Sequence, residues 1–101
     1  MSEFNTRKIP QELANSANAM ANLLAHIDKI HTTPKGAERI QRNLQLDTSS
    51  IKAINAYCKS KIADKKCRCC KWGKNYYCEI DDIRLTINSS SYTIITARFV
   101  K

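Results

Sequence analysis

The feature that most constrains this fold is a change in the spacing of apolar residues near position 64. Before that point, apolar side chains recur at steps of three and four, which is typical of amphipathic helices. After it, they alternate with polar side chains, which is typical of half-buried strands. The spacing predicts helices over 10–30, 34–46 and 50–63, followed by strands over 67–72, 75–80, 83–88 and 92–100.

This order of elements predicts an α+β fold, with three N-terminal helices packed on a three- to four-stranded antiparallel C-terminal sheet. The last strand is apolar on both faces, so it is expected to be central or covered. The outer face of the sheet is expected to be polar, with Asn75, Tyr77, Glu79, Arg84, Thr86 and Asn88. The inward positions are expected to be Leu13, Ala17, Met20, Leu24 and Ile27; Ala37, Ile40 and Leu44; Ile51, Ile54, Cys58 and Ile62; and Tyr76, Cys78, Ile80, Ile83, Leu85 and Ile87.

The length of 101 residues suits one domain over 1–101, with a frayed segment at 1–9, a helical part at 10–64 and the sheet at 67–100. No window approaches the apolar length of a membrane span. The N-terminus lacks the apolar core of a secretory signal. We therefore expect a cytoplasmic protein with no membrane partner.

The net charge of +8 arises entirely within residues 35–74. This segment contains eleven Lys and Arg and only three acidic residues, Glu38, Asp47 and Asp64. Such a concentrated basic segment is typical of proteins that bind polyanions, most often nucleic acid. A solvated, solubilising surface is the alternative interpretation.

Five cysteines are many for this length. Their spacing does not match the paired ligands of a structural zinc site, since adjacent Cys69 and Cys70 would point to opposite faces of a strand. Cys58 and Cys78 fall on inward stripes, where cysteine acts as a small apolar residue. The odd count and the missing secretion signal argue against disulfides. We therefore expect no metal and no cofactor.

The stretch "HTTPKGAERIQRNL" predicts a helix start, with Thr33 as N-cap and Pro34 at the first helical position. His31 stands just before it, among hydroxyls and ahead of a basic helix. It is either an ordinary loop residue or a base or phosphate ligand. The wider set of candidate phosphate- or nucleic-acid-binding residues is Thr32, Thr33, Arg39, Arg42, Asn43, Lys71, Trp72, Asn75, Tyr77, Asn88, Ser91, Tyr92 and Thr93.

The sequence contains no nucleotide-binding glycine loop, no serine-hydrolase motif and no zinc-protease motif. Few carboxylates, which would hold a metal ion, accompany the basic segment. If this protein is a nuclease, it should therefore be metal-independent. It should then act on RNA, whose 2′-OH supplies an internal nucleophile. That chemistry needs a base, cations for the phosphate and a hydroxyl donor. The predicted catalytic residues are His31, Lys74, Thr96 and Arg98.

Three stretches, "IDKIHTTPKGAERIQRNL", "WGKNYY" and "INSSSYTIITAR", resemble the signature blocks of the bacterial domain-of-unknown-function family 3781. The resemblance covers Leu24 to Arg98. Two positions depart from the family pattern: Tyr76 replaces its usual tryptophan, and Arg98 replaces its usual histidine. If that histidine is catalytic in the family, the resemblance implies an altered or inactive site here.

A second resemblance, at the level of element order, is to the barnase–EndoU–colicin–RelE group of ribonuclease folds. It implies a small basic endoribonuclease, toxin-like or active in RNA processing. The alternative is a non-catalytic module that binds nucleic acid or an acidic protein partner, such as a mobile-element protein that opposes host defence.

Overall fold

The computed structural model describes residues 16–100. Residues 10–15 of the first expected helix, with Leu13, lie outside this range, as does the segment expected to be frayed. The elements are α2 (Ser16–Ala25), the short 3-10 helix η2 (Ile27–Lys29), α3 (Pro34–Leu44), α4 (Ile51–Ala63), β1 (Arg68–Trp72), β2 (Asn75–Ile80), β3 (Ile83–Asn88) and β4 (Ile94–Phe99). The α+β prediction is confirmed in its order: helices first, then one antiparallel sheet.

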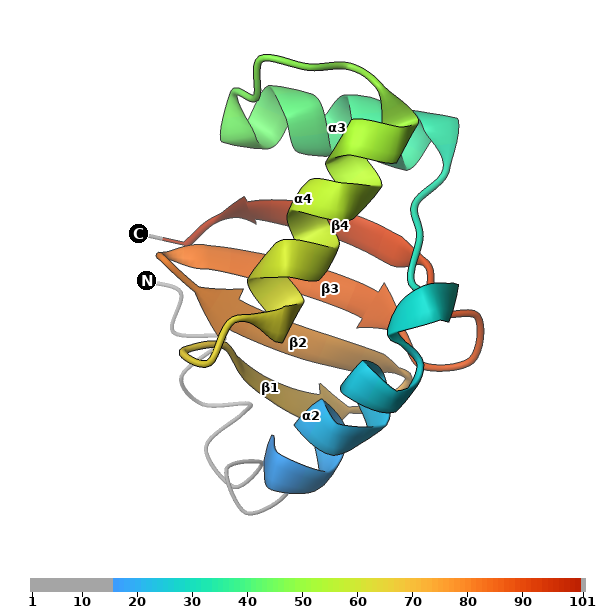
Figure 1. Ribbon diagram of the computed structural model, residues 1–101, viewed down its shortest axis with the longest axis vertical. Coiled ribbons are helices and arrows are strands. Elements are labelled where there is room, and N and C mark those ends of the chain that lie inside the picture. Colours follow the sequence, from blue (N-terminus) through green and yellow to red (C-terminus); the bar gives the residue numbers. More distant parts are fainter. Residues whose placement is uncertain (1–15, 101) are drawn as a thin grey trace.

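The molecule has two layers, with the helices on one face of the sheet (Figure 1). α3 packs on β4, α2 packs on β1, and α4 crosses the sheet between them and contacts β2. The strands follow one another in the order β1-β2-β3-β4. No helix within residues 16–100 is long and apolar enough to cross a membrane.

Tight turns fix the sheet register, because each hairpin leaves its strands no room to slip. Gly73 follows β1 with φ 66°, a conformation that favours glycine. Asp81 and Asp82 both have positive φ, 53° and 64°, as in the two-residue turns whose twist matches that of antiparallel strands. Both turns fall in the two-residue gaps, 73–74 and 81–82, between the strands expected from the sequence. They set Glu79 opposite Arg84 and Cys69 opposite Cys78.

The core between the layers contains most of the predicted inward residues, including Ile40, Ile54, Cys58, Ile62 and Leu85 at 1% exposure or less. Two predictions are wrong. Leu24 is 42% exposed, because Ala19 and Leu23 carry the buried face of α2 one position earlier. Ile51 is 38% exposed, because it occupies the first turn of α4.

The last strand was expected to be central or covered, and it is covered: β4 is an edge strand on which α3 packs. The polar outer face of the sheet holds a buried cation. Arg84 was expected among the polar residues of that face. It is 4% exposed, bonded through Nε to Glu79 Oε2 at 2.8 Å, with its guanidinium 6.0 Å from the ring of Tyr77. Pairing with a carboxylate and an aromatic ring makes the burial of this cation tolerable.

Burial raises the pKa of the Cys58 thiol to about 12, from an ordinary value of 9.0. The unfolded chain therefore loses this proton above pH 9 while the folded chain keeps it, so stability falls as pH rises from 9 toward 12. Between pH 8 and 10.5 the wild type should lose about 2 kcal/mol more unfolding free energy than a Cys58→Ala variant. Urea unfolding of both proteins at the two pH values tests this. Equal losses would contradict it.

Candidate functional site

His31 lies in an extended segment between η2 and α3 that pairs with the start of β4. Its backbone N–H donates to the Tyr92 carbonyl at 3.2 Å, and its carbonyl accepts from Ile94 N–H at 2.6 Å. The ring is exposed. Nδ1 lies 2.8 Å from the Lys29 carbonyl oxygen, which can only accept, so Nδ1 carries the proton. In the neutral ring, Nε2 therefore keeps its lone pair.

A chain of polar groups leads away from Nε2 of His31. Thr93 Oγ1 lies 3.4 Å from Nε2, and Ser91 Oγ lies 2.8 Å from Thr93 Oγ1. Asn88 Oδ1 accepts from the Ser91 hydroxyl at 3.3 Å and from the Ser90 and Ser91 backbone N–H groups at 2.8 and 2.9 Å. Asn88 thereby shapes the loop that presents both hydroxyls to the histidine.

The turn between β1 and β2 lies against the same loop, because Ser89 N–H donates to the Lys74 carbonyl at 2.9 Å. Register places Trp72 beside Asn75, and Asn75 beside Asn88, across three neighbouring strands. Seven predicted site residues therefore gather at one end of the sheet. We call them the sheet-end cluster: His31, Trp72, Lys74, Asn75, Asn88, Ser91 and Thr93.

Other predicted site residues dock α3 against β4. The buried Thr32 hydroxyl donates to the Ile94 carbonyl at 3.0 Å, and Thr33 caps α3 by accepting from Gly36 N–H at 3.0 Å. The Asn43 amide contacts the Ala97 carbonyl at 3.3 Å and Thr96 Oγ1 at 3.4 Å. These polar groups therefore have partners within the protein.

Three cations occur at positions i, i+4 and i+7 of α3, on one exposed helix face. We call Lys35, Arg39 and Arg42 the α3 basic row. Arg39 also reaches the Ile95 carbonyl at 3.5 Å, which places the row beside β4. Among residues 16–100 no carboxylate lies within ion-pair distance of the row, although Glu38 shares the helix. Lys35 was not among the predicted phosphate-binding residues. Its spacing of four and seven residues from the two arginines would have placed it on the same helix face.

Several predicted residues lie away from His31. Arg98 is five residues past Thr93 along β4, about 16 Å at the usual rise of a strand. Thr96 faces Thr86 and Asn43 instead. Lys71 lies on edge strand β1, and Tyr77 lies in the middle of β2. The predicted catalytic set of four is thus not assembled around one point: only Lys74 shares the sheet end with the histidine.

Tyr92 is held within the protein rather than offered to a ligand. Its ring stacks on His26 at 4.8 Å between centroids and on Tyr76 at 6.4 Å. The Asn22 amide donates to the hydroxyls of both tyrosines, at 3.0 Å to Tyr92. His26 Nδ1 contacts the Asn22 carbonyl at 2.8 Å. The sequence analysis did not predict the cluster of Asn22, His26, Tyr76 and Tyr92. The spacing of four residues between Asn22 and His26, which puts both on one helix face, is the one local feature that indicates it.

The expectation of no disulfide is wrong, because Cys69 and Cys78 are bonded. They are direct cross-strand partners with Cα atoms 4.1 Å apart, so the hairpin register brings them together. Cys58, Cys67 and Cys70 are buried and are not part of this disulfide. Burial, with a smaller effect from Asp64, raises the pKa of Cys67 to about 11. Among residues 16–100, one group of side chains lies close enough together to hold a metal ion: Cys67, Cys69 and Cys78.

Comparison with known proteins gives one match. The model of a family described as "Protein of unknown function (DUF3781)" matches residues 24–98. No curated protein and no solved structure matches the chain. The resemblance to ribonuclease folds therefore has no support from these comparisons.

Proposed function

We propose that this chain, which belongs to the DUF3781 family of proteins of unknown function, binds single-stranded RNA along the α3 basic row and across the sheet-end cluster. The observation that carries the proposal is the row itself: three exposed cations on one face of α3, without a carboxylate partner among residues 16–100. Exposed cations without a carboxylate partner are available to phosphates, and counterion release then drives association.

The surroundings of the row favour RNA over other polyanions. α3 begins three residues after His31, so an RNA strand that follows the row reaches the sheet end. There the Ser91 and Thr93 hydroxyls are suited to a 2′-OH, which accepts and donates hydrogen bonds. Exposed Lys74 offers a further cation.

Binding of a labelled 12-nucleotide RNA, followed by fluorescence anisotropy, tests the proposal. A Lys35→Gln/Arg42→Gln variant should bind about tenfold more weakly, with a salt slope smaller by about 1.4, because two phosphate contacts are lost. The matched control is Lys65→Gln/Lys66→Gln, which removes the same charge from exposed positions outside the row. The control should stay within about threefold of the wild type. Equal weakening, or no binding at low salt, would contradict the proposal.

Metal-independent RNA cleavage is a second candidate, favoured by the fixed tautomer of His31. With Nδ1 held by the Lys29 carbonyl, Nε2 has a lone pair for the proton of an RNA 2′-OH, which would approach beside the Thr93 hydroxyl, 3.4 Å from Nε2. The 2′ oxygen would attack phosphorus as the P–O5′ bond breaks, which gives a 2′,3′-cyclic phosphate and a 5′-hydroxyl that takes its proton from solvent. Lys74 would offset the charge on the phosphate. Distant Thr96 and Arg98 do not take part, so this candidate rests on fewer residues than the sequence predicted.

The acidic protein partner and the toxin-like or mobile-element role remain alternatives without a supporting contact.

A further inference from the structure

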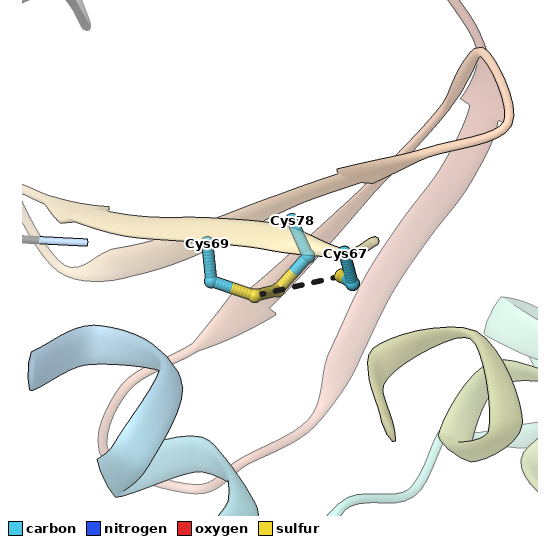
Figure 2. Close-up of side chains that lie close together, drawn as sticks. All are labelled: Cys67, Cys69 and Cys78. Carbon is cyan, nitrogen blue, oxygen red and sulfur yellow. Dashed lines mark hydrogen bonds between the residues drawn. A yellow bond between two sulfur atoms is a disulfide. The ribbon is translucent and has the colours of Figure 1, made fainter. Parts of the chain in front are cut away.

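Three of the five cysteines converge beneath the β1–β2 hairpin, as Figure 2 shows. The sulfurs of Cys67, Cys69 and Cys78 all lie within 4.8 Å of one another, and those of Cys67 and Cys69 are 3.9 Å apart. The three side chains are 7%, 2% and 0% exposed. None of these three cysteines belongs to the α3 basic row or the sheet-end cluster, and none takes part in the docking of α3.

The hairpin register produces this convergence. Cys67 directly precedes β1 and Cys69 lies within it, two residues later, so both side chains point to the helical side of the sheet. Cys78 stands directly opposite Cys69 on β2 and shares its face. Cys70 points to the other face and Cys58 lies on α4, so neither joins the group.

We propose that the reduced protein binds one soft monovalent cation of the Cu(I) class through Cys67, Cys69 and Cys78. A cation about 2.3 Å from three coplanar sulfurs holds them about 4.0 Å apart, close to the spacing of Cys67 and Cys69. Thiolate is the ligand type that selects such cations. The exposed Lys65, Lys66 and Arg68 flank Cys67 and offset the surplus negative charge of three thiolates around one monovalent ion.

Zn²⁺ fits the group less well, since structural zinc takes four ligands. Among residues 16–100, no fourth His, Cys, Asp or Glu joins the cluster. The burial of the three side chains also leaves little access for a water ligand. Three buried sulfurs match the low coordination that soft monovalent ions accept.

The Cys69–Cys78 disulfide makes this site conditional on reduction. A dithiol reductant converts the bond to two thiols, gives up two electrons and two protons, and becomes a disulfide itself. Binding of one Cu(I) then releases the three thiol protons to solvent. The oxidised protein has only the Cys67 sulfur left in the group and should not bind.

The test uses the full chain, reduced with a phosphine and freed of reductant without oxygen, and Cu(I) supplied as its complex with a coloured chelator. The wild type should take up one Cu(I) per chain, measured by loss of the chelator colour and by native mass spectrometry. Cys67→Ser, Cys69→Ser and Cys78→Ser should each weaken uptake at least 100-fold. Cys58→Ala and Cys70→Ala, which leave the group intact, should not.

The Cys67→Ser variant is the deciding one if loss of Cys69 or Cys78 disturbs folding, because it keeps both of those cysteines. Circular dichroism verifies that this variant is folded. Unchanged uptake by folded Cys67→Ser would overturn the three-sulfur site. So would uptake by air-oxidised wild type, no transfer from the chelator to the reduced protein, or equal losses in the Cys58 and Cys70 variants.

Discussion

A Gly36→Ala variant is expected to lose about 2–4 kcal/mol of unfolding free energy, although alanine is the better helix former. A Cβ at Gly36 would lie 2.1 Å from Thr32 Oγ1, far inside van der Waals contact, and 3.4 Å from the Ile94 carbonyl oxygen. The Thr32 hydroxyl cannot turn away freely, because it is buried and donates to that carbonyl. Overpacking costs about 1–3 kcal/mol and an unmade buried hydrogen bond a similar amount. Helix propensity returns only about 1 kcal/mol.

Urea unfolding followed by circular dichroism measures this loss. A double-mutant cycle with Thr32→Ala isolates its cause, because removing the hydroxyl removes the clash. We expect the double variant to be more stable than the sum of the single losses predicts, by about 1–2 kcal/mol. Strict additivity would show that Gly36 matters for another reason.

A His31→Ala variant is expected to lower any metal-independent RNA cleavage by about 10²–10⁴-fold, the usual contribution of a positioned general base. RNA affinity should change far less than the cleavage rate, because the α3 basic row is untouched. The assay is cleavage of RNA in excess EDTA, read by gel. His26→Ala removes the other histidine, which stacks on Tyr92 inside the protein, and should leave the rate unchanged.

The three outcomes of that assay have separate meanings. Cleavage lost only in His31→Ala supports a ribonuclease centred on this histidine. Cleavage that survives the substitution excludes the assigned role. RNA left intact by the wild type removes the catalytic candidate under these conditions, and the binding proposal is then judged by anisotropy alone.

The sheet was predictable because its signals are local. Alternation over 83–88 and the paired aspartates that follow β2 specify a hairpin without reference to the rest of the chain. The predicted buried face of α2 is wrong by one position, because the apolar residues of this helix form two neighbouring stripes. Only the packing of α2 on β1 decides between them. The prediction placed Leu24 inward, whereas the structure buries Leu23 and exposes Leu24.

The candidate site was less predictable because the same polar groups suit two partners. A threonine hydroxyl or an asparagine amide donates equally well to a phosphate or to a backbone carbonyl. Thr32 and Asn43 have carbonyl partners on β4, more than fifty residues away in the chain. The pairing of Cys69 with Cys78 likewise depends on strand register, which a count of cysteines does not include.

The docking of α3 also affects how copies of this protein meet one another. An edge strand presents unpaired backbone groups that can recruit a strand from another molecule and start aggregation. On β4, three carbonyls, those of Ile94, Ile95 and Ala97, are taken by side chains from Thr32, Arg39 and Asn43. On the opposite edge, β1 carries the charges of Arg68 and Lys71. Both borders of the sheet thus discourage strand addition, which favours a protein that stays dispersed at high concentration.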